Sequence, residues 1–372
     1  MKSNPDPLLL NRLSSYGAGF DCASGKELEE VAALGYTPSD FQQKVVYANP
    51  CKPNRDLKTA SIFGSPSTVV DSFEEVEKLK TYGYTGRTLI RILVEDKSSL
   101  MPFSRKFGIS PYKVKDLATF AKAKGIEVDG ISFHVGSGCY DKEQYRSAID
   151  TAHSCITQIR EVGFGPSLVD IGGGFTKSQG YLFQDTAAVI RASLVKDGSL
   201  RYIAEPGRFF SESAFDLFVQ VIGKKPAANE NGWRYTIDES LYGQFSCIPF
   251  DQKIPTWVRI ANDKNDRPRK PTNGILFGRT CDSLDMIAKS PSMEELMIGD
   301  WLWFPNMGAY TSVTASEFNG FPKPPVLNFE KEEMHLPDLE DLKKDNLRSR
   351  IPFDVTTVTG VSFGNSTIPC VA

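Results

Sequence analysis

Short apolar runs alternate with segments of helical spacing between about residues 18 and 208. Seven runs end in polar or glycine residues: Gly19–Cys22, Val45–Ala48, Thr68–Val70, Leu89–Val94, Ile131–Val135, Leu168–Ile171 and Tyr202–Ala204. Helical spacing recurs between them, at Lys26–Leu34, Phe73–Tyr82, Pro111–Lys124, Tyr145–Val162 and Phe183–Leu194. This alternation predicts an α/β fold in which crossover helices join parallel strands.

Polar or reactive residues lie at or near the end of each run: Asp21, Asn49, Asp71, Arg91, His134, Asp170 and Glu205. In a (β/α)8 barrel the strand ends converge on one face, so all seven groups can face one ligand. An open doubly wound sheet gathers far fewer of them in one crevice. We therefore expect the barrel, although the sequence supplies seven strands rather than eight.

The pattern changes after Arg208. Runs typical of strands follow without helices between them, at Phe215–Ile222, Gly232–Ile237, Trp257–Ile260, Gly274–Gly278 and Asp300–Phe304. They predict an all-β domain over residues 215–321, next to a barrel over residues 1–214. Residues 322–372 are rich in Pro and acidic residues, then in Ser and Thr, which predicts a poorly ordered extension.

Composition and charge narrow the classes of function. A net charge of −3 gives no reason to expect nucleic acid or a membrane as a partner. The seven cysteines form no C-x-x-C pair and the three histidines lie in no cluster with them, so we expect no metal site. Scattered cysteines also predict a reduced, intracellular chain, and we expect a cytoplasmic protein.

Two segments at late strand ends suit phosphate and cofactor chemistry. Asp170 to Phe175 contains Gly172, Gly173 and Gly174, whose amides can approach a phosphate closely, although three glycines also make a tight turn. Glu205 to Arg208 offers a carboxylate that can keep a pyridine nitrogen protonated and a guanidinium that can bind phosphate. A salt-bridged turn is the alternative there.

Two further segments are weaker signals. His134 can stack on a planar cofactor, with Ser137 and its loop amides near a phosphate, but a single histidine is more often structural. Cys281 follows Thr280 and precedes Asp282, so it can be an exposed thiol that donates a proton. Most cysteines are instead small buried hydrophobes.

In this order, these segments resemble the fold-III pyridoxal-phosphate-dependent decarboxylases, and the ornithine decarboxylase family most of all. The resemblance runs from residue 1 to about residue 321, and only the tail lies outside it. It is carried by Met1 to Leu9, Gly19 to Ser24, Tyr47 to Lys52, Leu89 to Ile92, His134 to Gly138, Asp170 to Phe175, Glu205 to Arg208, Cys281 to Asp285, Gly308 to Thr311 and Phe318 to Phe321.

The resemblance implies pyridoxal 5'-phosphate as cofactor and Lys2 as the lysine that binds it covalently. By itself Lys2 is a solvated terminal charge. Glu205 would pair with the pyridine nitrogen and His134 would stack on the ring, with Asp21 and Arg91 in support. The phosphate would be bound by Ser137, Gly172, Gly173, Gly174, Arg208 and Tyr310.

The resemblance also implies decarboxylation of L-ornithine to putrescine, the first step of polyamine biosynthesis. Asp251 and Asp282 would bind the distal ammonium group, with Tyr242 and Phe318 lining the same region. Cys281 would return a proton after carbon dioxide leaves. In the family the cysteine and its aspartate reach in from a second subunit, which implies a homodimer with shared sites.

Three departures from the family pattern stand out. Phe250 replaces a frequent tyrosine, and Ser283 replaces the usual glycine after the Cys-Asp pair. The family also has a segment before the lysine that contains the first barrel strand. We therefore expect an unclosed barrel, with Lys2 on a fraying terminus and not held at reactive geometry.

Two alternatives remain open. One is a decarboxylase of lysine, arginine or diaminopimelate. Asp251 rather than a longer Glu favours ornithine, and a Cys-Asp pair rather than Cys-Glu disfavours diaminopimelate. The other is an inactive, antizyme-binding relative, or a form inactive through truncation. Retention of Lys2, Glu205, Arg208 and Cys281 disfavours loss of activity by substitution.

Overall fold

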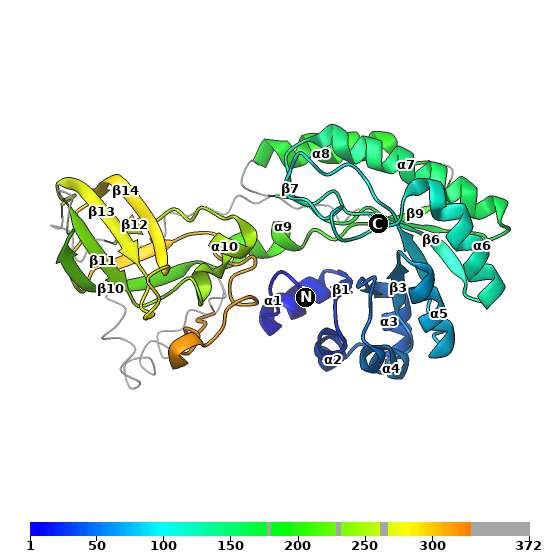
Figure 1. Cartoon of the computed structure of the whole chain (residues 1–372), viewed down its shortest axis with the longest axis horizontal. Coiled ribbons are helices and arrows are strands. Elements are labelled where there is room, and N and C mark those ends of the chain that lie inside the picture. The colour runs from blue at the N-terminus through cyan, green and yellow to red at the C-terminus, as the bar shows by residue number, and fades with distance from the viewer. Residues whose placement is uncertain (177–179, 197, 228–231, 261–266, 329–372) are drawn as a thin grey trace. The chain divides into compact units, whose positions relative to one another are not determined.

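The computed structural model describes residues 1–176, 180–196, 198–227, 232–260 and 267–328. One compact unit holds the described residues within 1–260 and 269–323 (Figure 1). Outside that unit, residues 267–268 and 324–328 are described and contain no helix or strand. Most of the predicted extension over residues 322–372 lies outside the described residues, and the predicted domain boundaries at 214 and 321 stay predictions.

A curled sheet of seven strands forms the first half of the unit. Each strand is parallel to its neighbours, and the order in space is the order in the chain. All seven predicted strands are confirmed: β1 (Phe20–Cys22), β2 (Val45–Tyr47), β3 (Ser67–Val70), β4 (Thr88–Arg91), β6 (Val128–Ser132), β8 (Leu168–Asp170) and β9 (Arg201–Ile203). The predicted α/β barrel architecture is present as a half-barrel, whose edges in the described part of the chain are β1 and β9.

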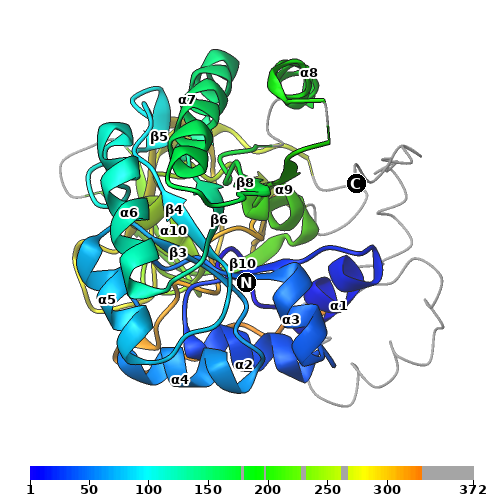
Figure 2. The same ribbon diagram turned by 90° about the vertical axis from the view of Figure 1, so that its right-hand side faces the viewer.

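Helices are arranged in an arc around these strands (Figure 2). Polar caps start several of them: the Ser24 side chain accepts from the amide of Glu27, and Ser72 accepts from that of Glu75. Their bounds are α1 (Pro7–Ser15), α2 (Gly25–Ala33), α3 (Pro38–Lys44), α4 (Asn54–Ile62), α5 (Phe73–Thr81), α6 (Val114–Lys124), α7 (Lys142–Glu161), α8 (Gly180–Ser193) and α9 (Gly207–Ser211), with 3-10 turns η1 (Pro111–Lys113) and η2 (Glu212–Ala214).

A short antiparallel pair of strands connects the loop after β4 with the loop after β6. In it β5 (Ser99–Met101) lies against β7 (Ser137–Cys139). Asp96 is buried and accepts from the amide of Ser104 at 2.7 Å, which shapes the loop that follows β5. The pair fixes the loop after β4 against the loop after β6.

A buried ion pair joins the ends of β2 and β3. Lys52 is 1% exposed, and its Nζ lies 2.9 Å from the Glu75 carboxylate. The same ammonium group donates to the carbonyls of Asn49 at 3.0 Å and Val69 at 2.8 Å. Burial lowers the pKa of Lys52, although the charge of Glu75 opposes that shift. The pair therefore fixes the strand ends on the side where the predicted site lies.

The second half of the unit is a six-stranded sheet with the order β12-β15-β10-β11-β13-β14. All neighbours are antiparallel except β11 and β13. Its strands are β10 (Leu217–Pro226), β11 (Trp233–Ile237), β12 (Val258–Arg259), β13 (Pro271–Phe277), β14 (Met286–Glu294) and β15 (Trp301–Phe304), accompanied by η3 (Gln244–Ser246), α10 (Cys247–Asp251) and η4 (Phe318–Gly320). The five predicted strands are confirmed. β14 was not predicted; it carries Pro291, which an edge strand tolerates.

No helix in the described ranges is long and apolar enough to cross a membrane. A group of three or more residues able to hold a metal ion is likewise absent from these ranges.

The buried pair yields a stability prediction. Lys52→Met removes the ammonium group that pairs with Glu75 and donates to two carbonyls. We expect the free energy of unfolding to fall by about 3 kcal/mol. This is the low end for a broken buried pair, because Lys78 still pairs with Glu75. The control is Lys26→Met, whose side chain is 73% exposed and 3.9 Å from Glu29; we expect a change of less than about 1 kcal/mol there. Urea denaturation measures both, and equal stability of the two variants contradicts the prediction.

Candidate active site

Lys2 lies against the end of β1. Its Nζ is 2.7 Å from each carboxylate oxygen of Asp21. Burial lowers the pKa of the Lys2 amine, but the neighbouring carboxyl groups, Asp21 first, raise that pKa by more, so it ends above the ordinary lysine value. Without a ligand, Lys2 is therefore an ammonium group that Asp21 holds in place.

The residues that follow Lys2 are fixed by the rest of the unit. Ser3 and Asn4 are each 6% exposed. The hydroxyl of Ser3 hydrogen bonds to that of Ser211 in α9, and the side-chain amide of Asn4 donates to the carbonyl of Gly308 at 2.8 Å. The expectation that Lys2 lies on a fraying terminus is therefore wrong for this structure, whereas its geometry toward a cofactor stays a prediction.

Glu205 and Asp170 form a buried carboxyl pair at the ends of β9 and β8. Asp170 is fully buried and its Oδ1 accepts from the amide of Gly172 at 2.9 Å. Burial, and then the charge of Asp170, raise the pKa of Glu205 well above its ordinary value; a hydrogen bond between the two carboxyls adds to the shift. Glu205 is thus the protonated member of the pair. Its Oε1 is buried and has no hydrogen-bond partner among the described residues.

His134 follows β6 and is held as a neutral ring. Its Nδ1 accepts from the amide of Gly136 at 3.0 Å, which leaves the ring proton on Nε2. Burial lowers the pKa of His134 well below its ordinary value, and the charges of Arg91 and Lys2 lower it further. The Phe103 ring lies 4.7 Å from the imidazole, centroid to centroid. An uncharged, flat imidazole at this position is suited to stacking on a planar ligand.

The three glycines after β8 pack more closely than any other residue type allows. Gly172 and Gly174 have φ of +65° and +98°, a region that favours glycine. A Cβ on Gly172 would lie 2.3 Å from the carbonyl oxygen of Phe133. A Cβ on Gly173 would lie 2.8 Å from His134 Nε2 and 2.8 Å from the carbonyl oxygen of Glu205. The loop is therefore a cradle of backbone beside the imidazole and the buried carboxyl.

Arg208 in α9 joins the glycine side of the site to the second sheet. One guanidinium nitrogen lies 2.5 Å from Asp251 Oδ1 and 3.1 Å from the hydroxyl of Ser137. Burial lowers the pKa of Arg208, but the hydrogen bond to Asp251 raises it by more. The guanidinium carbon lies 5.2 Å from the centre of the Tyr310 ring. Four predicted site residues are thus in contact here.

Asp251 ends α10 and has one oxygen to spare. It is 7% exposed, and its Oδ2 is a buried acceptor that no described residue satisfies. Burial raises the pKa of Asp251, and Arg208 opposes that shift. Tyr310 is anchored through its amide, which donates to the carbonyl of Ser3 at 2.9 Å. The segment before α1 and the Tyr310 loop therefore meet at this point.

A second group of predicted residues lies together on the other half of the unit. The hydroxyl of Tyr242 donates to Asp282, whose pKa is lowered by the Leu284 amide and then by this hydroxyl. The rings of Tyr242 and Phe318 lie 4.3 Å apart. Cys281 is exposed. Within the described ranges, no hydrogen bond, ion pair or ring contact joins this group to the Lys2 or Arg208 groups.

Two strand-end residues hold backbone instead of facing the site. The side-chain amide of Asn49 donates to the carbonyl of Ala23 at 3.1 Å, and Asp71 accepts from the amide of Gly108 at 2.8 Å. The guanidinium carbon of Arg91 lies 4.7 Å from the centre of the Phe107 ring. The expected convergence of seven groups therefore holds for only part of the set.

Two roles were missed at the sequence level. The hydrogen bond from Glu205 to Asp170 sets the protonation of the site, and Asp285 holds the loop that carries Cys281. Asp285 is 1% exposed and accepts from the amide and the hydroxyl of Thr280 and from the amide of Leu241. The sequence could have predicted the contact of Glu205 with Asp170, because neighbouring parallel strands that both end in carboxylates bring these groups together.

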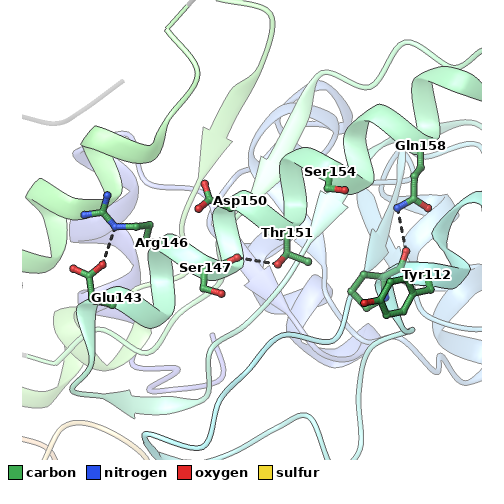
Figure 3. A pocket seen from close by; sticks show the side chains of 9 residues that line it. Tyr112, Glu143, Arg146, Ser147, Asp150, Thr151, Ser154 and Gln158 are labelled. Carbon is green, nitrogen blue, oxygen red and sulfur yellow. Dashed lines mark hydrogen bonds and ion pairs between the residues drawn. The ribbon is translucent and has the colours of Figure 1, made fainter.

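A hollow of about 750 Å³ lies elsewhere in the described part of the chain, along α7 (Figure 3). It is lined by Pro111, Tyr112, Glu143, Arg146, Ser147, Asp150, Thr151, Ser154 and Gln158, none of which is a predicted site residue. Its polar groups satisfy one another: Arg146 pairs with Glu143 at 2.8 Å and Gln158 donates to the Pro111 carbonyl at 3.2 Å. This solvated helix face is not the candidate site.

Comparison with known proteins identifies the first half of the chain. Residues 1–212 match the family described as pyridoxal-dependent decarboxylase, pyridoxal binding domain. The chain is 39% identical over 330 residues to the ornithine decarboxylase of Schizosaccharomyces pombe, covering 86% of this chain and 74% of that protein. It is 37% identical over 342 residues to antizyme inhibitor 2 of Xenopus laevis, covering 88% and 74%.

A solved structure agrees with these relatives. The arginine decarboxylase of Paramecium bursaria Chlorella virus bound to agmatine superposes with a TM-score of 0.79 at 35% identity, covering 86% of each chain. Because the superposed part is 86% of this chain, it includes residues of the second sheet as well as the first. The chain therefore belongs to the pyridoxal-dependent decarboxylase family.

Proposed function

We propose that the chain decarboxylates L-ornithine to putrescine with pyridoxal 5'-phosphate as cofactor, the entry reaction of polyamine biosynthesis. The observation that carries this proposal is the carboxyl of Glu205, whose buried Oε1 lacks a partner among the described residues. Relatives named ornithine decarboxylase, 36–39% identical, support the substrate. Free cysteines at all six described positions support a cytoplasmic location.

The residues of the site fit the cofactor. The glycine cradle leaves no room for a Cβ, as close approach of a phosphate to backbone requires, and the unpaired Oε1 of Glu205 suits a ring nitrogen. When bound, the cofactor supplies an electron sink for the charge left by the departing carboxylate.

Lys2 is the group that binds the cofactor covalently. Covalent attack needs a neutral amine, whereas the Asp21 carboxylate holds Lys2 as an ammonium group at 2.7 Å. Asp21 therefore keeps the side chain in position and is the nearest group that can receive its proton. Because Ser3 and Asn4 are buried, the amine has a fixed location from which to react.

His134, Glu205 and Arg208 bind the three parts of the cofactor. The neutral His134 ring stacks on the planar ring without adding positive charge that would compete with the ring nitrogen. Glu205 shares its proton with Asp170, which leaves its buried Oε1 as the acceptor for a protonated ring nitrogen. Arg208 and Ser137, already in contact, bind the phosphate together with the amides of the glycine loop.

The distal ammonium group of the substrate is bound by Asp251. Its Oδ2 is a buried acceptor without a partner in the described part of the chain, and a cationic side chain would satisfy it. Because Asp251 is buried, a neutral substrate side chain would leave its Oδ2 without a partner, so the site would select against neutral side chains. Aspartate is shorter than glutamate, which leaves room for a side chain of the length of ornithine.

Cys281 returns the proton, and we propose that it does so across the interface of a homodimer. Cys281 is exposed, and no described contact links its group to Lys2. The neighbouring Leu284 and Phe318 are 76% and 42% exposed, an apolar surround that a second subunit would cover. Asp282 and Tyr242 would then reach the partner's site together with Cys281.

Two other functions remain as second candidates. The Chlorella virus arginine decarboxylase shows that this fold serves a longer basic substrate, so arginine or lysine is the alternative within the enzyme class. Antizyme inhibitor 2 supports the alternative of an inactive protein that binds antizyme. The intact contacts of Lys2, Glu205 and Arg208 favour the enzyme.

The first prediction concerns attachment of the cofactor. The 372-residue chain mixed with pyridoxal 5'-phosphate should show the visible absorbance of a lysine-bound cofactor, and borohydride should fix the label on the peptide that contains Lys2. Lys2→Ala removes the label, while Lys26→Ala, an exposed lysine on α2, keeps it. A label on another lysine, or none, contradicts the proposal and favours the inactive alternative.

The second prediction concerns the substrate. With ornithine, lysine, arginine and diaminopimelate assayed side by side, kcat/KM should be highest for ornithine. Asp251→Asn should lower kcat/KM for ornithine about 100-fold or more, because a buried charged pair is lost with one partner left unpaired. Release of carbon dioxide measures turnover. A preference for any of the other three amino acids contradicts the assigned substrate.

The third prediction concerns the shared site. Lys2→Ala and Cys281→Ala should each be nearly inactive alone. Mixed and allowed to exchange subunits, they should recover about a quarter of wild-type activity, since half of the dimers are mixed and each has one intact site. Activity that stays at the level of the single variants shows that Cys281 acts within its own chain or not at all. Sedimentation confirms exchange of subunits.

A further inference from the structure

Each of the three carbonyl groups of the glycine loop after β8 accepts a hydrogen bond from a neighbouring part of the protein. The carbonyl of Gly172 accepts from the amide of Glu205 at 2.7 Å, and that of Gly174 accepts from the amide of Cys139 at 3.1 Å. Between them, the carbonyl of Gly173 accepts from the hydroxyl of Tyr145 at 3.0 Å. Two of these three ties are backbone amides, and the third is a side chain.

These ties fix the direction of the amides that follow. In a planar trans peptide the C=O and N–H groups point in opposite directions, and no cis bond occurs among the described residues. A carbonyl held toward the body of the protein therefore turns the next amide away from it. The hydroxyl of Tyr145, bound to the Gly173 carbonyl, aims the amide of Gly174 out of the loop.

Tyr145 is placed to do this by the first turn of α7. Asp141 caps that helix, and the tyrosine side chain is fully buried beneath the loop. Its ring stacks on Phe175 at 5.1 Å, and its hydroxyl lies 2.7 Å from where a Cβ on Gly174 would be. Burial raises the pKa of Tyr145 well above its ordinary value, so the hydroxyl keeps its proton and remains a donor.

We propose that Tyr145 is a positioning residue for the cofactor phosphate: its hydroxyl holds the Gly173–Gly174 peptide so that the Gly174 amide faces the phosphate. This inference rests on the proposed function. Tyr145 does not touch the ligand itself. Successive amides turned the same way form an anion site, and a freely rotating peptide in a glycine loop would lose part of that site.

The test compares two ligands that differ only in the phosphate. Pyridoxal and pyridoxal 5'-phosphate both react with Lys2 and both present a ring to Glu205 and His134. For Tyr145→Phe, we expect the dissociation constant of pyridoxal 5'-phosphate to rise about three- to tenfold, as for loss of one hydrogen bond. The dissociation constant of pyridoxal should change less than about twofold, because its contacts do not include the phosphate.

The control is Tyr84→Phe. Tyr84 is also buried, and its hydroxyl also donates to one backbone carbonyl, that of Pro66 at 2.5 Å. Tyr84 lies in the first half of the unit, outside the groups of the candidate site. Tyr84→Phe should leave the dissociation constants of both ligands unchanged, even if this variant unfolds at a lower temperature than the wild type.

A second measurement does not involve the cofactor. Inorganic phosphate should raise the midpoint of thermal unfolding of the cofactor-free wild type and of Tyr84→Phe, and raise that of Tyr145→Phe less. Equal weakening of both ligands, or no change in either, overturns the inference and leaves Tyr145 as a packing residue. A wild-type chain that does not take up pyridoxal 5'-phosphate contradicts the proposed function instead.

Discussion

Three carboxyl groups surround one ammonium group at the end of the parallel sheet, and the charge balance of the site depends on that arrangement. Asp21 contacts Lys2 directly, Glu205 lies close enough to influence the Lys2 pKa, and Asp170 acts on Glu205 from the neighbouring strand end. Because buried like charges cannot all be ionised, one proton stays on the pair. Asp170 is stabilised as the charged member by the Gly172 amide, so the proton falls to Glu205. In the proposed function, a cofactor ring nitrogen would therefore meet the unpaired Oε1 of Glu205.

The parallel sheet makes this crowding possible. β8 and β9 are in register, with Asp170 opposite Ile203, so the residues that follow β9 lie beside those that follow β8. The glycine loop closes the gap because its carbonyls accept hydrogen bonds from both neighbouring segments, through the amides of Glu205 and Cys139. The same bonds that hold the loop close also turn its amides outward. Packing and ligand binding are therefore two results of one set of backbone hydrogen bonds.

Much of this is visible in the sequence, and the rest has physical reasons for staying hidden. Hydrophobic periodicity located all seven parallel strands, since buried parallel strands are nearly continuous apolar runs. Lys2 was found only by resemblance, because a terminal lysine carries no periodic signal. Ser3 and Asn4 hold it through contacts some 200 and 300 positions away, with Ser211 and Gly308. Tyr145 looks like an ordinary core residue of a helix, and only the structure shows where its hydroxyl points.

The second half of the unit contributes to the site in two different ways. Asp251 is buried and paired with Arg208, so the two binding roles proposed for these residues would share one ion pair. A cation at the free Oδ2 of Asp251 would draw negative charge away from Arg208 and leave the guanidinium freer for a phosphate. Cys281 instead lies on an exposed loop that the buried Asp285 holds rigid. A thiol on a rigid, exposed loop is suited to entering another chain's site at a fixed depth, which a flexible loop would not ensure.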